Sequence, residues 1–275
     1  MSHYLRRVAI SMPPHSISRI AALTALIGAL VFVACQTVPE TGRKQVNFMN
    51  PAEEAALGFS EFDKIKKNLP ISTNSNYNDQ VQRVGARLSK VMPVPNAQWE
   101  FIVFEDGSPN AFALPGGKVG VHTGLFQITQ NDAGLAAVIG HEVAHIVARH
   151  SGEKLSRGIV STAIVTGAGF ALGEEGALAT AALAGGALVG RQGFSRKQEL
   201  EADRMGAIFM ARAGYDPAES VELWKRFAGW RQTNSQSGGN LPFLSSHPVD
   251  EKRISELQRF MPEAKANFEA ASTHQ

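Results

Sequence analysis

The chain has one cysteine, Cys35, and no apolar run that is clearly long enough to cross a membrane. A single thiol excludes disulfide bonds within the chain. The uncharged apolar stretch at residues 20–34 is short for a helix that spans a bilayer. No basic patch with interleaved aromatic residues is present, so nothing indicates nucleic acid as a partner. The 27 Lys and Arg nearly balance the 25 Asp and Glu, so net charge does not indicate a class of partner.

The apolar stretch has the features of a bacterial secretion signal. Three arginines precede it, and Cys35 follows it in a context similar to a lipobox. We expect a signal peptide at residues 1–34, cleavage before Cys35 and a lipid anchor on its sulfur. Gln36 favours anchoring to the outer membrane, on the periplasmic side. Because Phe32 is less usual than leucine at its position, cleavage elsewhere or retention as an anchor stays open.

The most specific pattern is His-Glu-Val-Ala-His at residues 141–145. On a helix, His141 and His145 lie one turn apart on the same face, so both imidazoles can reach one zinc ion. Glu142 would then point toward the water that the ion holds. Apolar residues at helical spacing and the absence of proline from Asp132 onward predict this helix. The alternative is a chance match on an alanine-rich helix.

A catalytic zinc normally has three protein ligands, so a third donor is needed. The metzincin pattern does not supply one, because its glycine position is Ala148 and its histidine position is Ser151. His150 falls one residue short of the required direction.

A second predicted helix offers a better donor in Glu-Leu-Glu-Ala-Asp at residues 199–203. Glu199 and Asp203 share a helical face, so one carboxylate can bind zinc while the other holds the free ring nitrogen of a ligand histidine. Glu201 lies about 200° around the helix from Glu199 and is expected to point toward solvent or an arginine. A surface charge is the favoured reading of Glu201.

Three further segments accompany these two motifs: Asn-Ala-Phe-Ala-Leu-Pro-Gly-Gly at 110–117, Ser-His-Pro at 246–248, and Arg253-Ile254. In combination they resemble the M48 group of gluzincin metallopeptidases, most closely its soluble periplasmic lipoprotein branch, over residues 40–260. The resemblance implies an α+β fold, mainly helical and zincin-like, with a small β-sheet beside the active-site helix. It also implies one zinc ion per chain with Glu199 as the third ligand, which is one of the two carboxylates that helical spacing places on this face.

The resemblance and the chemistry of such sites assign roles to the remaining polar residues. Glu142 would act as general base on the zinc-bound water. His247 and Arg253 are candidates for stabilising the developing oxyanion. His247 could instead occupy the open zinc position as a latch, as is thought for some soluble relatives, or be only a loop histidine before a proline. His122 and His150 are expected to be structural or surface residues.

Strand patterns suggest how a substrate binds. Residues 98–104 alternate as a strand, residues 105–110 are rich in turn formers, and residues 111–114 read as a short edge strand beside residues 118–122. An exposed edge next to zinc can bind an extended peptide through its backbone. The candidate substrate-binding residues are Asn110, Ala111, Phe112 and Ala113. An ordinary sheet edge is the alternative.

The rest of the chain predicts one domain. Residues 35–49 would be a tether, 50–260 the peptidase domain and 261–275 a frayed C-terminal tail. Helices are expected at 51–68 after an Asn50 cap, at 79–92 after a polar turn, and at about 216–232. A polar loop at 233–242 could gate the cleft. Residues 158–190, rich in Ala and Gly, predict two helices packed near the active site, with peripheral membrane contact as the weaker hypothesis.

Two functions fit these observations. The first is a zinc endopeptidase for protein quality control, acting on unfolded or misassembled envelope proteins. The second is a zinc-containing outer-membrane assembly or chaperone-like binding factor with latched or rare proteolysis. Glu142 favours the first, because a pure binding module needs no base beside the metal. Partners would be protein substrates, the membrane through lipidated Cys35, and outer-membrane assembly machinery or other envelope proteases.

Overall fold

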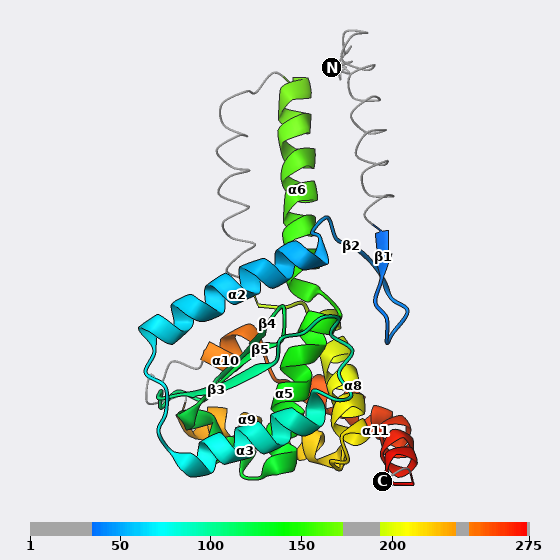
Figure 1. The fold of residues 1–275 in the computed structure, drawn as a ribbon. Coiled ribbons are helices and arrows are strands. Elements are labelled where there is room, and N and C mark those ends of the chain that lie inside the picture. Colours follow the sequence, from blue (N-terminus) through cyan, green and yellow to red (C-terminus); the bar gives the residue numbers. More distant parts are fainter. Residues whose placement is uncertain (1–34, 173–192, 235–241, 274–275) are drawn as a thin grey trace, which may run out of the picture.

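The computed structural model describes residues 35–172, 193–234 and 242–273, and it is mainly helical with two small sheets (Figure 1). This confirms the α+β class and the small sheet beside the motif helix. None of the helices in these described ranges is long and apolar enough to cross a membrane. The signal peptide expected at residues 1–34 and most of the loop at 233–242 lie outside the described residues.

The chain enters the fold through a short hairpin, which replaces the tether expected at residues 35–49. Strands β1 (Cys35–Thr37) and β2 (Lys44–Val46) pair antiparallel. Helix α2 (Pro51–Asn68) follows, and the Asn50 side chain accepts a hydrogen bond from the Ala52 N–H, as the cap prediction requires. The next helix, α3 (Ser75–Leu88), begins four residues before the predicted start because Asn74 caps it.

A three-stranded sheet covers one side of the central helix. Its strands are β3 (Glu100–Phe104), β4 (Ala111–Leu114) and β5 (Lys118–His122), in the order β3-β5-β4. Strand β5 is parallel to β3 and antiparallel to β4. The predicted edge strand and its neighbour are therefore confirmed, and β4 has a second edge that pairs with no strand of the described residues. A 3₁₀ turn (Thr123–Leu125) and helix α4 (Phe126–Thr129) lead out of the sheet.

Helix α5 (Asp132–Val147) lies between this sheet and helix α8 (Arg196–Arg212) (Figure 1). Helices α9 (Ala218–Asn234), α10 (Pro242–Ser246) and α11 (Glu251–Ser272) complete the bundle. Because α5 is covered on nearly all sides, most of its residues are buried, and its apolar side chains form the centre of the core. The tail expected from residue 261 is instead helical through Ser272.

Helix α6 (His150–Leu172) leaves the body of the domain and points away from α5 and α8 (Figure 1). Its first turns carry the exposed side chains Leu155 and Ile159. The segment at 158–190 predicts two helices packed near the active site. Its described part is helical, and the exposed Ile159 does not fit a core position there. Residues 173–192 lie outside the described residues.

Candidate metal centre

Two helices approach unusually closely where the motif histidines lie. A Cβ on Gly206 of α8 would lie 2.8 Å from the backbone nitrogen of His141, and one on Gly140 of α5 would lie 3.0 Å from the carbonyl oxygen of Gly206. Only glycine permits this backbone approach without displacement. The contact places the carboxylates of α8 within reach of the histidines of α5.

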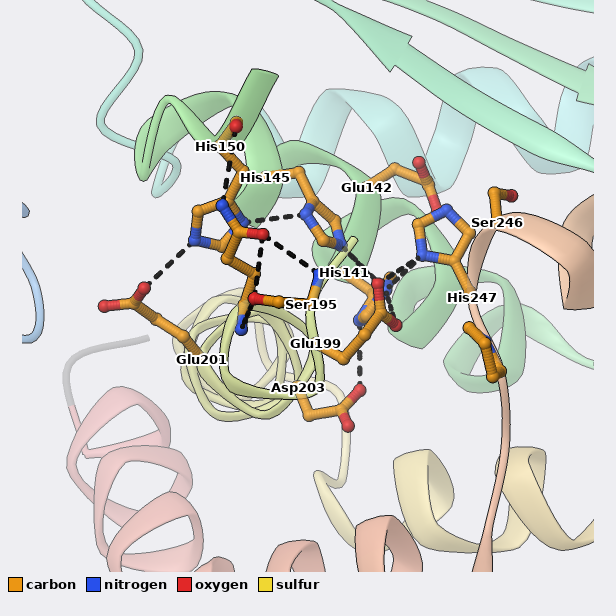
Figure 2. Close-up of polar contacts among 12 residues, drawn as sticks. His141, Glu142, His145, His150, Ser195, Glu199, Glu201, Asp203, Ser246 and His247 are labelled. Carbon is orange, nitrogen blue, oxygen red and sulfur yellow. Dashed lines mark hydrogen bonds and ion pairs between the residues drawn. The ribbon is translucent and has the colours of Figure 1, made fainter. Parts of the chain in front are cut away.

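Four donor residues converge at this contact: His141, His145, Glu199 and His247 (Figure 2). One donor atom from each lies within 4.8 Å of the others, and all four residues are buried. The Nε2 atoms of His141 and His145 are 3.1 Å apart, and the Glu199 carboxylate lies 3.5 Å from His145 Nε2. The structure thus brings together the three residues predicted to bind zinc and adds His247 to them.

The donor set and the neighbouring Glu142 fit a zinc ion. Imidazole and carboxylate are the usual ligands of catalytic zinc. Glu142 is 5% exposed, and its Oε1 has no hydrogen-bond partner among the described residues. Burial raises the pKa of Glu142 to about 7, close to the value at which a general base works best. Such an oxygen is available to a water molecule bound beside it.

Asp203 lies behind His141. Its Oδ1 is 3.0 Å from His141 Nδ1, which leaves Nε2 of the same ring directed at the donor cluster. Burial alone would raise the pKa of Asp203, but the Arg253 charge and hydrogen bonds hold it below its usual value. Asp203 is therefore an anion that can fix the ring orientation and the proton position of His141.

Arg253 links Glu199 and Asp203 of α8. Its Nε and Nη2 bind Asp203 at 2.6 and 2.8 Å, its Nη1 lies 2.7 Å from Glu199, and its guanidinium stacks 4.0 Å from the Trp224 ring centre. Burial would raise the pKa of Glu199, yet Arg253 and two histidine hydrogen bonds hold it far below its usual range. Since all three guanidinium nitrogens are engaged, this geometry supports a positioning role over donation to a substrate.

His247 lies between Glu142 and Glu199. Its Nδ1 is 3.0 Å from Glu199 Oε1, and its Nε2 is 3.3 Å from Glu142 Oε1 (Figure 2). Helix α10 and the following turn place it there, with its backbone N–H bonded to the Phe243 carbonyl. Its position is compatible with a latch on the metal and with a proton or hydrogen-bond donor beside Glu142.

His150 and Glu201 form a second polar layer behind His145. His150 Nδ1 lies 2.8 Å from His145 Nδ1, and His150 Nε2 lies 3.0 Å from Glu201 Oε2 (Figure 2). If His145 binds metal through Nε2, its Nδ1–H donates to His150, whose Nε2–H donates to Glu201. His150 is fully buried, so its expected structural role fits better than a surface position.

The favoured prediction that Glu201 is a surface charge is wrong, because the residue is 7% exposed. Its Oε2 accepts a hydrogen bond from Arg43 Nε at 2.6 Å, and its Oε1 accepts one from the Thr41 hydroxyl. Arg43 also binds Glu153 with two nitrogens at 2.9 Å. The arginine foreseen as the other partner of Glu201 thus comes from the N-terminal hairpin.

Two aromatic contacts escaped prediction. Phe194 stacks on His145 with ring centres 4.0 Å apart, and Trp224 lies edge-on to His141 at 5.2 Å. Neither residue stands near a recognisable motif. By contrast, His122 is buried beside Asp106 and Ser108, away from the donor cluster, as expected of a structural residue.

The edge strand presents its backbone to this site. The Asn110 carbonyl accepts a hydrogen bond from the His122 N–H, so alternate residues of β4 bond to β5 and the peptide groups of Ala111 and Ala113 face the free edge. The backbone of Ala113 lies close enough to the Glu142 carboxylate to lower its pKa, which agrees with this alternation. Phe112 packs its side chain against Phe62 and Phe104, so its side chain belongs to the aromatic cluster under the sheet.

The sequence is similar to one family of known proteins. The model of peptidase family M48 matches residues 75–261. The mitochondrial metalloendopeptidase OMA1 of Schizosaccharomyces pombe is 34% identical over 256 residues, covering 92% of this chain and 74% of that protein. OMA1 of Saccharomyces cerevisiae is 38% identical over 181 residues, covering 62% and 50%.

A bacterial relative shows the same similarity at lower identity. A putative beta-barrel assembly-enhancing protease of Vibrio cholerae is 29% identical over 226 residues, covering 80% of this chain and 46% of that protein. The chain therefore spans about three quarters of the fission yeast protein and about half of the other two relatives.

Proposed function

The chain belongs to peptidase family M48 and is a metalloendopeptidase, and we propose that it uses zinc to hydrolyse peptide bonds of unfolded or misassembled envelope proteins. One zinc ion would be held by His141, His145 and Glu199. The observation that carries this proposal is the convergence of these three donors beside the buried Glu142, whose Oε1 accepts no hydrogen bond from the described residues and has His247 Nε2 3.3 Å away. A site that only stored metal or bound a partner would not need this base.

The residues around the metal donors have separate roles in the proposed hydrolysis. Zinc, when bound, would lower the pKa of a water molecule and polarise the scissile carbonyl. Glu142 accepts the proton of that water and later gives it to the leaving amine. Asp203 holds the Nδ1 proton of His141, and Arg253 fixes the carboxylates of Glu199 and Asp203. The free edge of β4 aligns the substrate backbone through the peptide groups of Ala111 and Ala113.

The choice of substrate follows from this mode of binding. Backbone pairing along β4 recognises an extended chain whatever its side chains, which suits segments that a folded protein would hide. The bacterial relative, named as a putative beta-barrel assembly-enhancing protease, supports a role in the envelope. Outer-membrane assembly machinery and other envelope proteases are the partners we propose on this basis.

The proposed location is the periplasmic face of the outer membrane. Cleavage before Cys35 and attachment of a lipid to its sulfur would place the hairpin next to the membrane, with residues 50–260 as the peptidase domain. Exposure of the Cys35 side chain is compatible with such a modification. Replacing Cys35 with Ser should release the chain from membranes, which fractionation of cells would test.

His247 supports a second candidate function. Because it lies 3.0 Å from Glu199 and 3.3 Å from Glu142, it could hold the metal closed in a zinc-containing outer-membrane assembly or chaperone-like factor that rarely cleaves. Substitution of His247 with Ala distinguishes this latched factor from the active endopeptidase. A large gain in cleavage would favour the latched factor, whereas a loss of cleavage with zinc retained would favour His247 as a catalytic donor.

The experiment that tests the proposed function is removal and return of the metal. The chain from Cys35 onward, with Cys35 replaced by Ser, would be stripped by a chelator and then given back zinc. Cleavage of an unfolded protein should stop and then return. Cleavage that persists after the metal has been removed would contradict the proposal.

A further inference from the structure

A cavity of about 270 Å³ opens beside the donor cluster, between helix α2, the end of strand β4 and the start of α6. His145 and Ile146 form the part of its wall nearest the donors. The volume lies just below the roughly 300 Å³ at which pockets for whole small-molecule ligands begin, so the cavity suits a single side chain.

The wall of this cavity is largely apolar, although Glu54, Glu61, Arg149 and Ser151 also line it. Leu57 of α2 and Leu155 of α6 line it, and these side chains are 61% and 50% exposed. Leucines this exposed on two helices that face one concavity indicate an apolar partner. Both carboxylates of the wall are already paired, Glu54 with Arg149 at 2.8 Å and Glu61 with Lys64 at 3.2 Å, so a cationic side chain gains little there.

The position of the cavity relative to β4 is fixed by a close backbone contact. A Cβ on Gly58 of α2 would lie 2.1 Å from the carbonyl oxygen of Pro115, the residue directly after β4. Leu114 and Pro115 form the cavity wall on this side. The free edge of β4, which carries the outward peptide groups of Ala111 and Ala113, therefore leads directly to the cavity.

The direction in which a substrate pairs with β4 determines which of its residues reaches the cavity. Antiparallel pairing is the more stable arrangement, and it places the N-terminal half of an added peptide at the C-terminal end of β4. The scissile bond must lie beside Glu142, at the level of Ala113. Pro115, at the cavity wall, is two residues after Ala113, and two residues along a strand cover about 6.6 Å.

From this arrangement we propose that the cavity between α2, β4 and α6 is a specificity subsite for a large apolar side chain, located about two residues before the scissile bond. The inference rests on the proposed peptidase function and deepens it. Enrichment of Leu, Met or Phe at this substrate position is the expected preference, since such residues are buried in folded proteins and become available when proteins unfold.

The test uses the full chain and a mixture of denatured proteins, with cleavage sites mapped by mass spectrometry. The variants Leu57→Asp and Leu155→Asp place a charge in the cavity wall at exposed positions. Ile71→Asp is the matched control, because Ile71 is 51% exposed but bridges to β3 at the other edge of the sheet.

The parent and the Ile71 variant should show the apolar enrichment, and both cavity variants should lose it. For a peptide with leucine at this position, kcat/KM should fall roughly tenfold in the cavity variants, with little change for the matching alanine peptide. Cleavage without enrichment, enrichment only after the scissile bond, or enrichment that survives both variants would overturn the subsite. Absence of zinc-dependent cleavage by the parent would overturn the proposed function itself.

Discussion

Asp203 Oδ1 lies 3.0 Å from His141 Nδ1, and the same carboxylate is bound by two nitrogens of Arg253. The pair joins a residue of the motif helix to one on a helix 62 positions later in the sequence. Because the ring of a metal-binding histidine is oriented by the partner of its other nitrogen, this contact controls how well His141 can bind metal.

Substitution of Asp203 with Asn tests this control. Loss of the negative charge should weaken zinc binding by about 10–100-fold, because the amide is a poorer acceptor for the His141 Nδ1–H. Zinc affinity can be measured by competition with a coloured chelator. Glu222→Gln, a change of the same kind at an exposed carboxylate paired with Lys225, should leave the affinity unchanged. Equal affinities in the two variants would show that Asp203 does not orient the ligand.

Arg43 offers a second test, through stability. It binds the buried carboxylates of Glu201 and Glu153, so Arg43→Met should lower the free energy of unfolding by about 3 kcal/mol near pH 7. Despite the opposing effect of burial, hydrogen bonds from His150, Thr41 and Arg43 lower the pKa of Glu201 from 4.5 to about 2.

The pH dependence of this effect follows from the sign of that shift. A carboxyl group whose pKa is lowered by folding stabilises the fold fully above its unfolded pKa and loses this contribution as it becomes protonated. The difference between the parent and Arg43→Met should therefore shrink as the pH falls from about 4.5 toward 2. Urea unfolding at pH 7 and pH 3 would measure it, and a difference that grows at pH 3 would refute the ion-pair account.

The helix contact at Gly206 gives a third test. In Gly206→Ala the new methyl group would meet the backbone of His141, so α5 and α8 must separate, at a cost of about 1–3 kcal/mol in unfolding free energy. Zinc binding should weaken as well, because Glu199 moves with α8. Gly229→Ala on α9 is the control, since nothing lies within 4 Å of its Cβ position, and it should stabilise the fold slightly. Thermal unfolding and zinc titration would compare the two variants. An unchanged zinc affinity in Gly206→Ala would contradict the role of this helix contact in metal binding.

Sequence reasoning worked where a side chain's direction depends on local helical geometry. His141, His145, Glu199 and Asp203 were all identified from spacing within two helices, and the structure brings these four residues together. Strand β4 was predicted equally well, since a short apolar segment after a turn-rich stretch and before a Pro-Gly-Gly turn marks a short edge strand. Whether these residues bind zinc and substrate stays a prediction.

Prediction from the sequence failed where the burial of a side chain depends on a segment far away in the chain. Glu201 points away from the donors, as predicted, but that side of α8 is covered by a hairpin whose Arg43 lies 158 positions earlier. No pattern near residue 43 signals this contact. The start of α3 differs for a local reason: the polar residues before Asp79 predict a turn, whereas Asn74 among them caps the helix.

The most direct measurement of the central claim compares the parent with Glu142→Gln, both starting at Cys35 with that residue replaced by Ser. Zinc content and cleavage of an unfolded protein would be measured on the same samples. The account predicts about one zinc per chain in both and cleavage by the parent alone, because Glu142 moves a proton and holds no metal. Equal cleavage by both proteins, or absence of zinc from both, would contradict it.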